Sequence, residues 1–320
     1  MYDISVISVF QDNKDLVDTF LASLRSVVET SLQLKIEVVL VDNCSHDGTF
    51  ERLYFYQNEI NQNKSNIHIK LIKTVTKRSL PENRNAGAYY TDSKILMFVD
   101  SDVLFSQEKF FEKIINIWNQ ERPDILCPSI LNVNNNRIQT VGVKCGTGIL
   151  KYKAYMFMNG RDFDSLDKDL MFNVEMVHGA AFLISTDLFL TLKGFDEEMK
   201  PYNFDEMDLI FRSHKYKPRI LSTTKIMIRH FGSGTTSKIR KTLRGYYFTS
   251  HLFRSMILNE GQLGGALFSL IYLIPLSYVF WSEGYGNPLY ILKALFWAMK
   301  RSAKPLNINF STKAQDIIYG

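Results

Sequence analysis

Apolar and polar residues follow a regular order over the first 130 residues of the chain. Short runs of apolar, mostly β-branched residues predict strands, and between them lie longer stretches with the three-to-four-residue spacing of amphipathic helices. The strands are expected at residues 4–10, 36–41, 69–72 and 95–99. Helices are expected at residues 14–29, 49–61 and 107–121, with a further one that opens at Pro81. This alternation is typical of an α/β domain with a mainly parallel sheet.

The alternation ends after residue 131, where the chain reads differently. The run "NVNNNR" predicts a hairpin turn, "HGAAFLIS" a further buried strand, and residues 205–214 a charged helix. No internal repeat is visible. We therefore predict that residues 1–236 form one α/β domain and that residues 237–320 form a separate helical region.

The C-terminal region is both basic and apolar. Four residues share one helical face, namely Phe248, Leu252, Met256 and Ile257. Nineteen uncharged residues follow at 263–281, a length close to what a bilayer requires. Residues 230–305 hold nine Lys or Arg and two Glu, a net charge of +7 against +5 for the whole chain. Such a segment favours either a peripheral contact with anionic membrane, through residues 243–305, or a buried hairpin or interface between copies of the chain.

The cysteines and the N-terminus limit the class of protein. Cys44, Cys127 and Cys145 are odd in number and widely spaced, which disfavours a disulfide scaffold and a zinc site. The first residues lack a basic segment followed by a cleavage site, so they predict a strand and not a signal peptide. We expect a cytoplasmic protein.

Polar clusters follow three of the predicted strands. They are "FQDN" at 10–13, "VDNCSHDGT" at 41–49 and "DSD" at 100–102. Ligands of parallel sheets bind beyond the carboxyl ends of the strands, so these clusters predict one binding rim. The Asp-x-Asp pair provides hard oxygen ligands that suit a divalent metal and a nucleotide diphosphate.

Eight segments occur in a family-specific order: "SVISVFQDN", "VVLVDNCSHDGT", "PENRNAG", "MFVDSDV", "HGAAFLI", "KGFDEEM", "NFDEMDL" and "RHFGSG". Together they resemble the family 2 glycosyltransferases, of the rhamnosyltransferase-like type that builds bacterial surface glycans. The resemblance spans about residues 4–234. It implies the Rossmann-like GT-A fold, a mainly parallel sheet flanked by helices, with a C-terminal helical extension. It also implies a nucleotide-sugar-binding half at 1–130 and an acceptor-side half at 131–236.

The resemblance implies roles for individual residues. Donor-binding residues would be Phe10, Asp12, Asp42, Arg84, Asn85, Asp100 and Ser101. Metal ligands would be Asp100, Asp102 and His230, and the acceptor side would include His178, Gly179 and Ala180. The acidic motif would supply the general base, which alignment places at Glu206 with Asp205 as its neighbour. The family's usual order is Glu then Asp, and this chain reverses it, so the choice between Asp205 and Glu206 stays open.

The implied activity is that of a metal-dependent inverting hexosyltransferase (EC 2.4). It would move a sugar from a UDP- or dTDP-sugar to a saccharide or lipid-linked saccharide acceptor in surface glycan synthesis. The implied cofactor is Mn²⁺ or Mg²⁺, and the implied location is the cytoplasmic face of the inner membrane, without nucleic acid as a partner. Two alternatives stay open, a sugar nucleotidyltransferase and a catalytically inactive GT-A binding protein.

Overall fold

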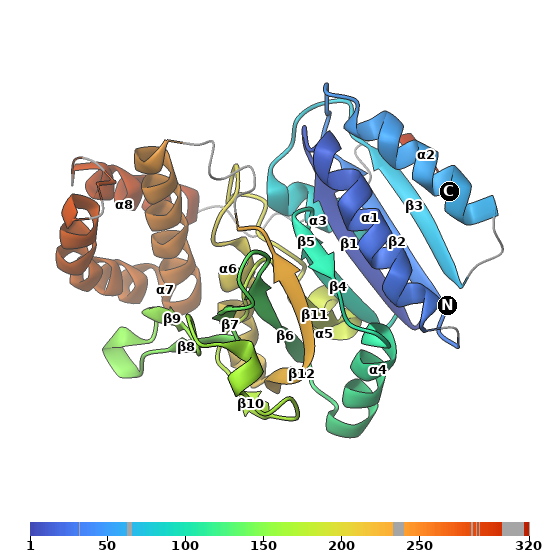
Figure 1. Ribbon diagram of the computed structural model, residues 1–320. Helices are drawn as coiled ribbons and strands as arrows, with labels where there is room; N and C mark the ends of the chain where they lie inside the picture. Colours follow the sequence, from blue (N-terminus) through green and yellow to red (C-terminus); the bar gives the residue numbers. More distant parts are fainter. Residues whose placement is uncertain are drawn as a thin grey trace.

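The computed structural model describes residues 1–31, 33–62, 66–232, 240–282, 284–285, 287, 289–302 and 317–319. An eleven-stranded mixed sheet runs through it, with helices on both faces (Figure 1). The strand order along the main path is β10-β12-β6-β11-β4-β1-β2-β3-β13. The predicted α/β fold with a mainly parallel sheet is confirmed.

The first half of the sheet is parallel, as the pattern predicts. Its strands are β1 (Ile4–Phe10), β2 (Ile36–Asp42), β3 (Ile67–Lys73) and β4 (Ile95–Asp100). These bounds agree with the predicted ranges to within two residues. Phe10 lies opposite Asp42 in register, so the polar segments that follow β1 and β2 emerge at one edge.

The second half of the sheet is mixed and contains shorter strands. They are β5 (Val103–Phe105), β6 (Ile125–Asn132), β7 (Ile138–Thr140), β10 (Met171–Asn173), β11 (Ala181–Ser185) and β12 (Ile220–His230). The pair β8 (Val143–Cys145) and β9 (Ala154–Met156) forms a separate two-stranded sheet. The predicted hairpin turn is confirmed, because β6 and β7 pair antiparallel across "NVNNNR".

Helices cover the sheet on both sides and enclose two hydrophobic clusters. One cluster packs under α1 (Lys14–Glu29), α2 (Thr49–Gln62) and α4 (Phe110–Glu121). The other packs under α3 (Leu80–Tyr89), α5 (Thr186–Thr191) and α6 (Asp205–Ser213). Short 3₁₀ turns occur at Gly148–Leu150, Phe163–Ser165 and His214–Tyr216. The alternation of side chains along β1 supplies both clusters, since Val6 belongs to the first and Ile7 to the second.

Two C-terminal helices lie beside the domain (Figure 1): α7 (Lys241–Ser282) and α8 (Leu289–Ser302). The predicted apolar face of α7 is confirmed, with Leu252, Met256 and Ile257 buried and Phe248 partly buried. The helix is interrupted at Gly261, whose φ of 77° is open to glycine without a steric penalty.

The C-terminal region is not helical throughout, which corrects the prediction for residues 237–320. Residues Ile317–Tyr319 form β13, which pairs antiparallel with β3 at the sheet edge, and the C-terminus lies near α2 (Figure 1). The ring of Tyr319 packs against Phe50 and Tyr54, and its carbonyl accepts a hydrogen bond from Gln57. A short strand gains its stability from such contacts and from the open edge of β3, which local sequence does not reveal.

Candidate active site

A cleft of about 540 Å³ opens at the carboxyl ends of β1 and β4, where the polar clusters were expected to meet. It is lined by residues from both halves of the domain. Donor-half side chains include Gln11, Asn13, Asn43, Arg78, Asp100 and Asp102, and the other wall includes His178, Tyr202, Asn203, Glu206 and His230. The predicted rim is therefore one continuous cleft.

Strand pairing brings together three groups that could hold a metal ion. Asp100 ends β4, and Val103 of β5 pairs with His230 at the end of β12. Asp102 lies in the short turn between β4 and β5, and its backbone carbonyl accepts a hydrogen bond from the Phe231 N–H. Ligand atoms of Asp100, Asp102 and His230 consequently lie within 4.8 Å of one another.

The surroundings of this cluster suit a divalent cation. The Nε2 atom of His230 lies 3.2 Å from Oδ1 of Asp102. Gln139 holds the other side of the ring, because its Oε1 lies 2.8 Å from Nδ1 and its Nε2 donates to the His230 carbonyl. A partner of this kind fixes a histidine with its second nitrogen directed at a metal. Burial raises the pKa of Asp100. The negative charge of Asp102 raises this pKa further, whereas Arg84 lowers it. A bound cation would therefore offset unfavourable negative charge at Asp100.

Arg84 connects the cluster to the acidic motif. Its Nη2 donates to Asp100 Oδ1 at 2.8 Å and to the Gly179 carbonyl at 3.0 Å, while Nη1 donates to Asp205 Oδ2 at 2.8 Å. The side chain is 4% exposed. Arg84 therefore bridges Asp100 and Asp205 from inside the protein.

Glu206 lies in the first turn of α6 and faces the cleft. No group of another described residue forms a hydrogen bond with its carboxylate. A Cβ atom on Gly179 would stand 2.9 Å from Glu206 Cδ, so a larger residue there would displace the Glu206 carboxylate. Burial and the neighbouring Asp205 raise the pKa of Glu206 to about 8. An unpaired carboxylate with a raised pKa in a cleft is typical of a general base.

The two other acids of the motif, Asp205 and Asp208, each form an ion pair with an arginine. Asp205 is 1% exposed and paired with Arg84. Asp208 is buried and paired with Arg212 at 2.6 Å, and Arg212 also donates to the carbonyls of Leu192 and Gly194. Of the three acids, Glu206 alone has its carboxylate available to a ligand.

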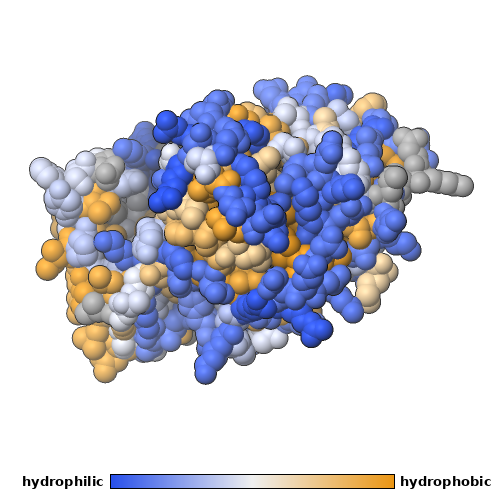
Figure 2. Space-filling model, turned by 60° about the horizontal axis from the view of Figure 1, so that its bottom comes forward, coloured by the Kyte–Doolittle hydropathy of each residue, from blue (hydrophilic) through white to orange (hydrophobic). Residues whose placement is uncertain are grey.

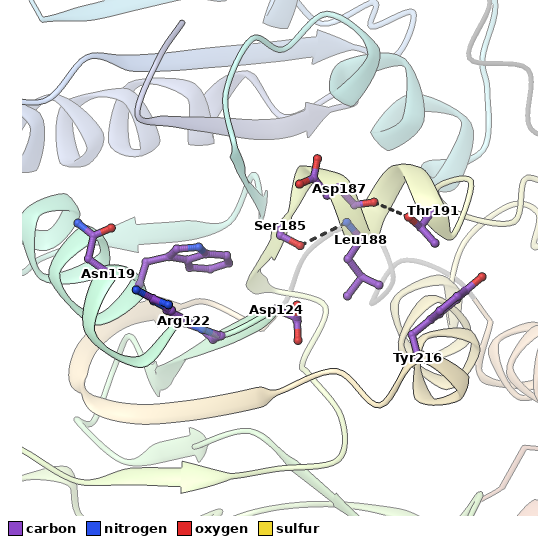
Figure 3. A pocket seen from close by; sticks show the side chains of 10 residues that line it. Asn119, Arg122, Asp124, Ser185, Asp187, Leu188, Thr191 and Tyr216 are labelled. Atoms are coloured by element: carbon purple, nitrogen blue, oxygen red, sulfur yellow. Dashed lines mark hydrogen bonds between the residues drawn. The ribbon is translucent and has the colours of Figure 1, made fainter.

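A second hollow, of about 760 Å³, lies at the opposite end of the sheet (Figure 3). Three of its polar side chains form hydrogen bonds with the local backbone. Asp124 accepts the Arg219 N–H, and Ser185 accepts the Leu188 N–H at the start of α5. The Thr191 hydroxyl donates to the Asp187 carbonyl. We therefore assign the active site to the first cleft, where the polar segments that follow β1, β2 and β4 meet Glu206.

Residues 5–191, more than half of the chain, match the family model described as glycosyl transferase family 2. The chain belongs to this family. No curated protein matches the chain. The resemblance expected from the ordered motifs is thus confirmed.

Solved structures similar to this family 2 chain share its fold. GalNAc-T7 with UDP, GalNAc and Mn²⁺ is 15% identical with a TM-score of 0.58, over 72% of this chain and 43% of GalNAc-T7. TarS 1–349 from S. aureus with UDP-GlcNAc is 17% identical with a TM-score of 0.52, over 87% and 72% of the two chains. The mannosyltransferase PcManGT from Pyrobaculum calidifontis with GDP-Man and Mn²⁺ is 12% identical with a TM-score of 0.53, over 95% and 89%. The GT-A fold is therefore shown, while this chain spans less than half of GalNAc-T7.

Several predicted site residues of the family 2 domain do line the cleft. The hydroxyl of Ser101 and the side-chain amide of Asn13 are hydrogen-bonded at 2.9 Å. His178, Gly179 and Ala180 form the opposite wall, and His178 Nδ1 accepts the Ala180 N–H at 3.1 Å. Burial lowers the pKa of His178 to about 4, so its ring is neutral beside His230.

Other predicted donor-binding residues are placed elsewhere. The Phe10 side chain is wholly buried and packs against Phe20, because this position of β1 faces α1. Asp42 is also wholly buried, and its Oδ2 accepts the Ser45 N–H. Asp12 lies at the outer rim, where it accepts the His46 N–H and pairs with Lys77. These three side chains do not line the cleft in this structure.

Of the two remaining predicted donor-binding residues, Arg84 lines the cleft and Asn85 does not. Both terminal nitrogens of Arg84 are used in the bridge described above. The Asn85 amide bonds the backbone N–H and carbonyl of Phe195 and donates to Glu197. The side chain of Asn85 on α3 therefore points toward residues 195–197, and its hydrogen bonds connect α3 to that segment.

Sequence reasoning missed several lining residues. The Asn43 amide donates to Gln11 and to the Arg78 carbonyl, and it accepts the Arg78 N–H, so it joins three segments of the donor wall. Asn43 follows Asp42 in the polar cluster "VDNC", and this position could have indicated that it lines the cleft. Tyr202 directly precedes the motif "NFDEMDL" and Asn203 is its first residue, a place that would have suggested both as lining residues.

Proposed function

We propose that this chain is a metal-dependent inverting glycosyltransferase of the hexosyltransferase type. It moves a sugar from a UDP- or dTDP-sugar to a saccharide acceptor in surface glycan synthesis. One observation carries the proposal: the Asp100, Asp102 and His230 cluster and the unpaired Glu206 face the same cleft. A nucleotidyltransferase has no need for an unpaired base on the second wall, and family membership also disfavours it.

The metal belongs on the donor side of the cleft. Asp100, Asp102 and His230 would hold it, in keeping with the Mn²⁺ of GalNAc-T7 and PcManGT. When bound, the cation supplies positive charge for the diphosphate of the donor and its departure. Gln139 keeps His230 oriented, and Ser101 and Asn13 add polar groups beside the cluster.

Glu206 acts on the acceptor side. Its carboxylate takes the proton of the acceptor hydroxyl as that oxygen attacks the anomeric carbon, opposite the leaving nucleoside diphosphate. A single displacement of this kind inverts the anomeric configuration. Arg84 pairs with Asp205 and holds it next to Glu206, and the small residue Gly179 leaves space for the base. His178 and Ala180 complete the acceptor wall.

The C-terminal helices support a peripheral membrane contact. Their exposed large apolar residues are Leu243, Leu263, Leu267, Leu270, Ile271, Ile274, Tyr278, Val279, Trp281, Leu289, Tyr290, Leu292, Phe296 and Met299. Figure 2 shows apolar surface at this end of the molecule. Among the described helices, α7 is long and apolar enough to cross a membrane, which by itself is weak support for a span.

The kink at Gly261 and the packing of α7 on α8 suit helices that lie in the headgroup region. Lys293 and Lys300 are exposed on α8 and match an anionic lipid surface. We therefore place the enzyme at the cytoplasmic membrane face, with a lipid-linked saccharide as a suitable acceptor. A contact between copies of the chain is the competing explanation of the same surface.

Product stereochemistry tests the proposed function. The full chain is incubated with Mn²⁺ and a panel of UDP- and dTDP-sugars, together with candidate saccharide acceptors. Release of the nucleoside diphosphate identifies the donor, and NMR of the product reports its anomeric configuration. We expect Mn²⁺-dependent release and an inverted product. A retained configuration would exclude the role proposed for Glu206.

A further inference from the structure

The segment directly before the acidic motif has an unusual backbone conformation. Asn203 and Phe204 both have left-handed φ angles, of 82° and 73°. Neither is glycine, so contacts from the surroundings must hold this conformation. Asp205 and Glu206 follow at once as the first turn of α6. The direction in which Glu206 points therefore depends on how this segment is fixed.

His251 of α7 contacts this segment at its backbone. Its Nδ1 lies 2.7 Å from the Asn203 carbonyl oxygen, and its Nε2 lies 3.2 Å from the Lys200 carbonyl oxygen. Both oxygens are acceptors and a neutral imidazole has one N–H, so we assign that N–H to the shorter contact. The ring is wholly buried and packs against Trp297 of α8.

A second contact fixes the start of the same loop. Arg254, one helical turn after His251, donates from Nε and Nη2 to the Asp196 carboxylate at 2.7 and 3.2 Å. Both side chains are buried. Arg301 of α8 pairs with Glu198. The C-terminal helices thus hold residues 196–204 at both ends, through side chains that do not line the cleft.

We propose that His251 is a positioning residue for Glu206, which it orients through the Asn203 carbonyl and the left-handed turn into α6. This inference rests on the proposed function, because it concerns the base assigned there. His251 does not line the cleft and takes no part in proton transfer. A base must lie within hydrogen-bond reach of the acceptor hydroxyl, and a displacement of about 1 Å can lower the rate roughly a hundredfold.

The test uses the full chain and separates turnover from donor binding. His251→Ala is expected to lower kcat by at least about tenfold, because the turn before Glu206 loses its hydrogen bond. The affinity for UDP with Mn²⁺, measured by calorimetry, is expected to change less than about twofold. His251→Gln keeps an N–H that can donate to the Asn203 carbonyl, so it should recover most of kcat.

His214→Ala is the matched control. Nε2 of His214 also contacts a backbone carbonyl, that of Glu175 at 2.9 Å, but His214 is exposed and lies beyond the end of α6. We expect this variant to keep the activity of the unmodified chain. Should His251→Ala fail to fold, His251→Met replaces it, since methionine fills the space without donating a hydrogen bond.

Three results would overturn the inference. They are a folded His251→Ala with unchanged kcat, a His251→Met as active as His251→Gln, and a parallel loss of kcat and UDP affinity, which would indicate a general structural role. Glu206→Gln distinguishes this failure from that of the proposed function. If Glu206→Gln is inactive while His251→Ala is active, only the inference on His251 fails. If Glu206→Gln is active, the proposed base is wrong, and the role of His251 falls with it.

Discussion

Replacing Glu206 by glutamine should lower kcat by roughly a hundredfold or more and stabilise the fold. The pKa of Glu206 rises from an ordinary 4.5 to about 8, through burial and the nearby Asp205. The folded state therefore favours the protonated Glu206 carboxyl. The free energy of unfolding is highest below the pKa that Glu206 has in the unfolded chain, and it falls as the pH rises toward 8. At roughly 1.4 kcal/mol per pH unit, the cost near neutral pH is up to about 3 kcal/mol. A neutral amide of the same shape avoids this cost.

Chemical denaturation near pH 7 and near pH 5 checks the stability of Glu206→Gln. We expect the variant to be more stable than the unmodified chain at the higher pH, by an amount that shrinks at the lower pH. Its kcat should fall by roughly a hundredfold or more, with UDP affinity nearly unchanged. In the unmodified chain, kcat/KM should rise with pH through about 8, as the base loses its proton. A variant that is less stable at both pH values, or one that keeps its turnover, would refute the environment assigned to Glu206.

Three further predictions concern other parts of the chain. Asp102→Ala should abolish Mn²⁺-dependent turnover while circular dichroism melting stays close to that of the unmodified chain, and unchanged turnover would contradict the metal site. Asp205→Asn weakens the pair with Arg84 and should lower kcat less than Glu206→Gln does, whereas an inactive Asp205→Asn beside an active Glu206→Gln would make Asp205 the base. Ile274→Glu should weaken co-sedimentation with phosphatidylglycerol vesicles, and high salt should weaken it for the unmodified chain, while Leu190→Glu, an exposed residue of α5, should have no effect. Unchanged vesicle binding by Ile274→Glu, or a change in oligomeric state instead, would favour an interface between copies.

The parallel half of the sheet could be predicted because its strands are largely buried on both faces. Such strands read as continuous apolar runs, so β1, β2 and β4 were placed within one residue of their bounds. β13 escaped prediction because three residues carry little pattern, and its pairing with β3 joins parts of the chain more than 240 residues apart.

The composition of the site was easier to predict than its contacts. The Asp-x-Asp spacing indicated Asp100 and Asp102, and the ordered motifs added His230 and Glu206. The partners of Arg84 were not visible, because Asp100 and Asp205 lie 16 and 121 residues away in sequence. That bridge decides which acid of the motif is unpaired. Phe10 and Asp42 were misplaced for a related reason, since a motif identifies a position but not the depth at which its side chain is buried.

Calorimetric titration of nucleotide sugars, with and without Mn²⁺, tests the central claim most directly. The claim is that Asp100, Asp102 and His230 hold a cation which the donor diphosphate requires. We expect a UDP- or dTDP-sugar to bind the full chain when Mn²⁺ is present, and chelation of the metal to abolish this binding. Equal donor affinity with and without Mn²⁺, or a lack of binding by every nucleotide sugar, would contradict it.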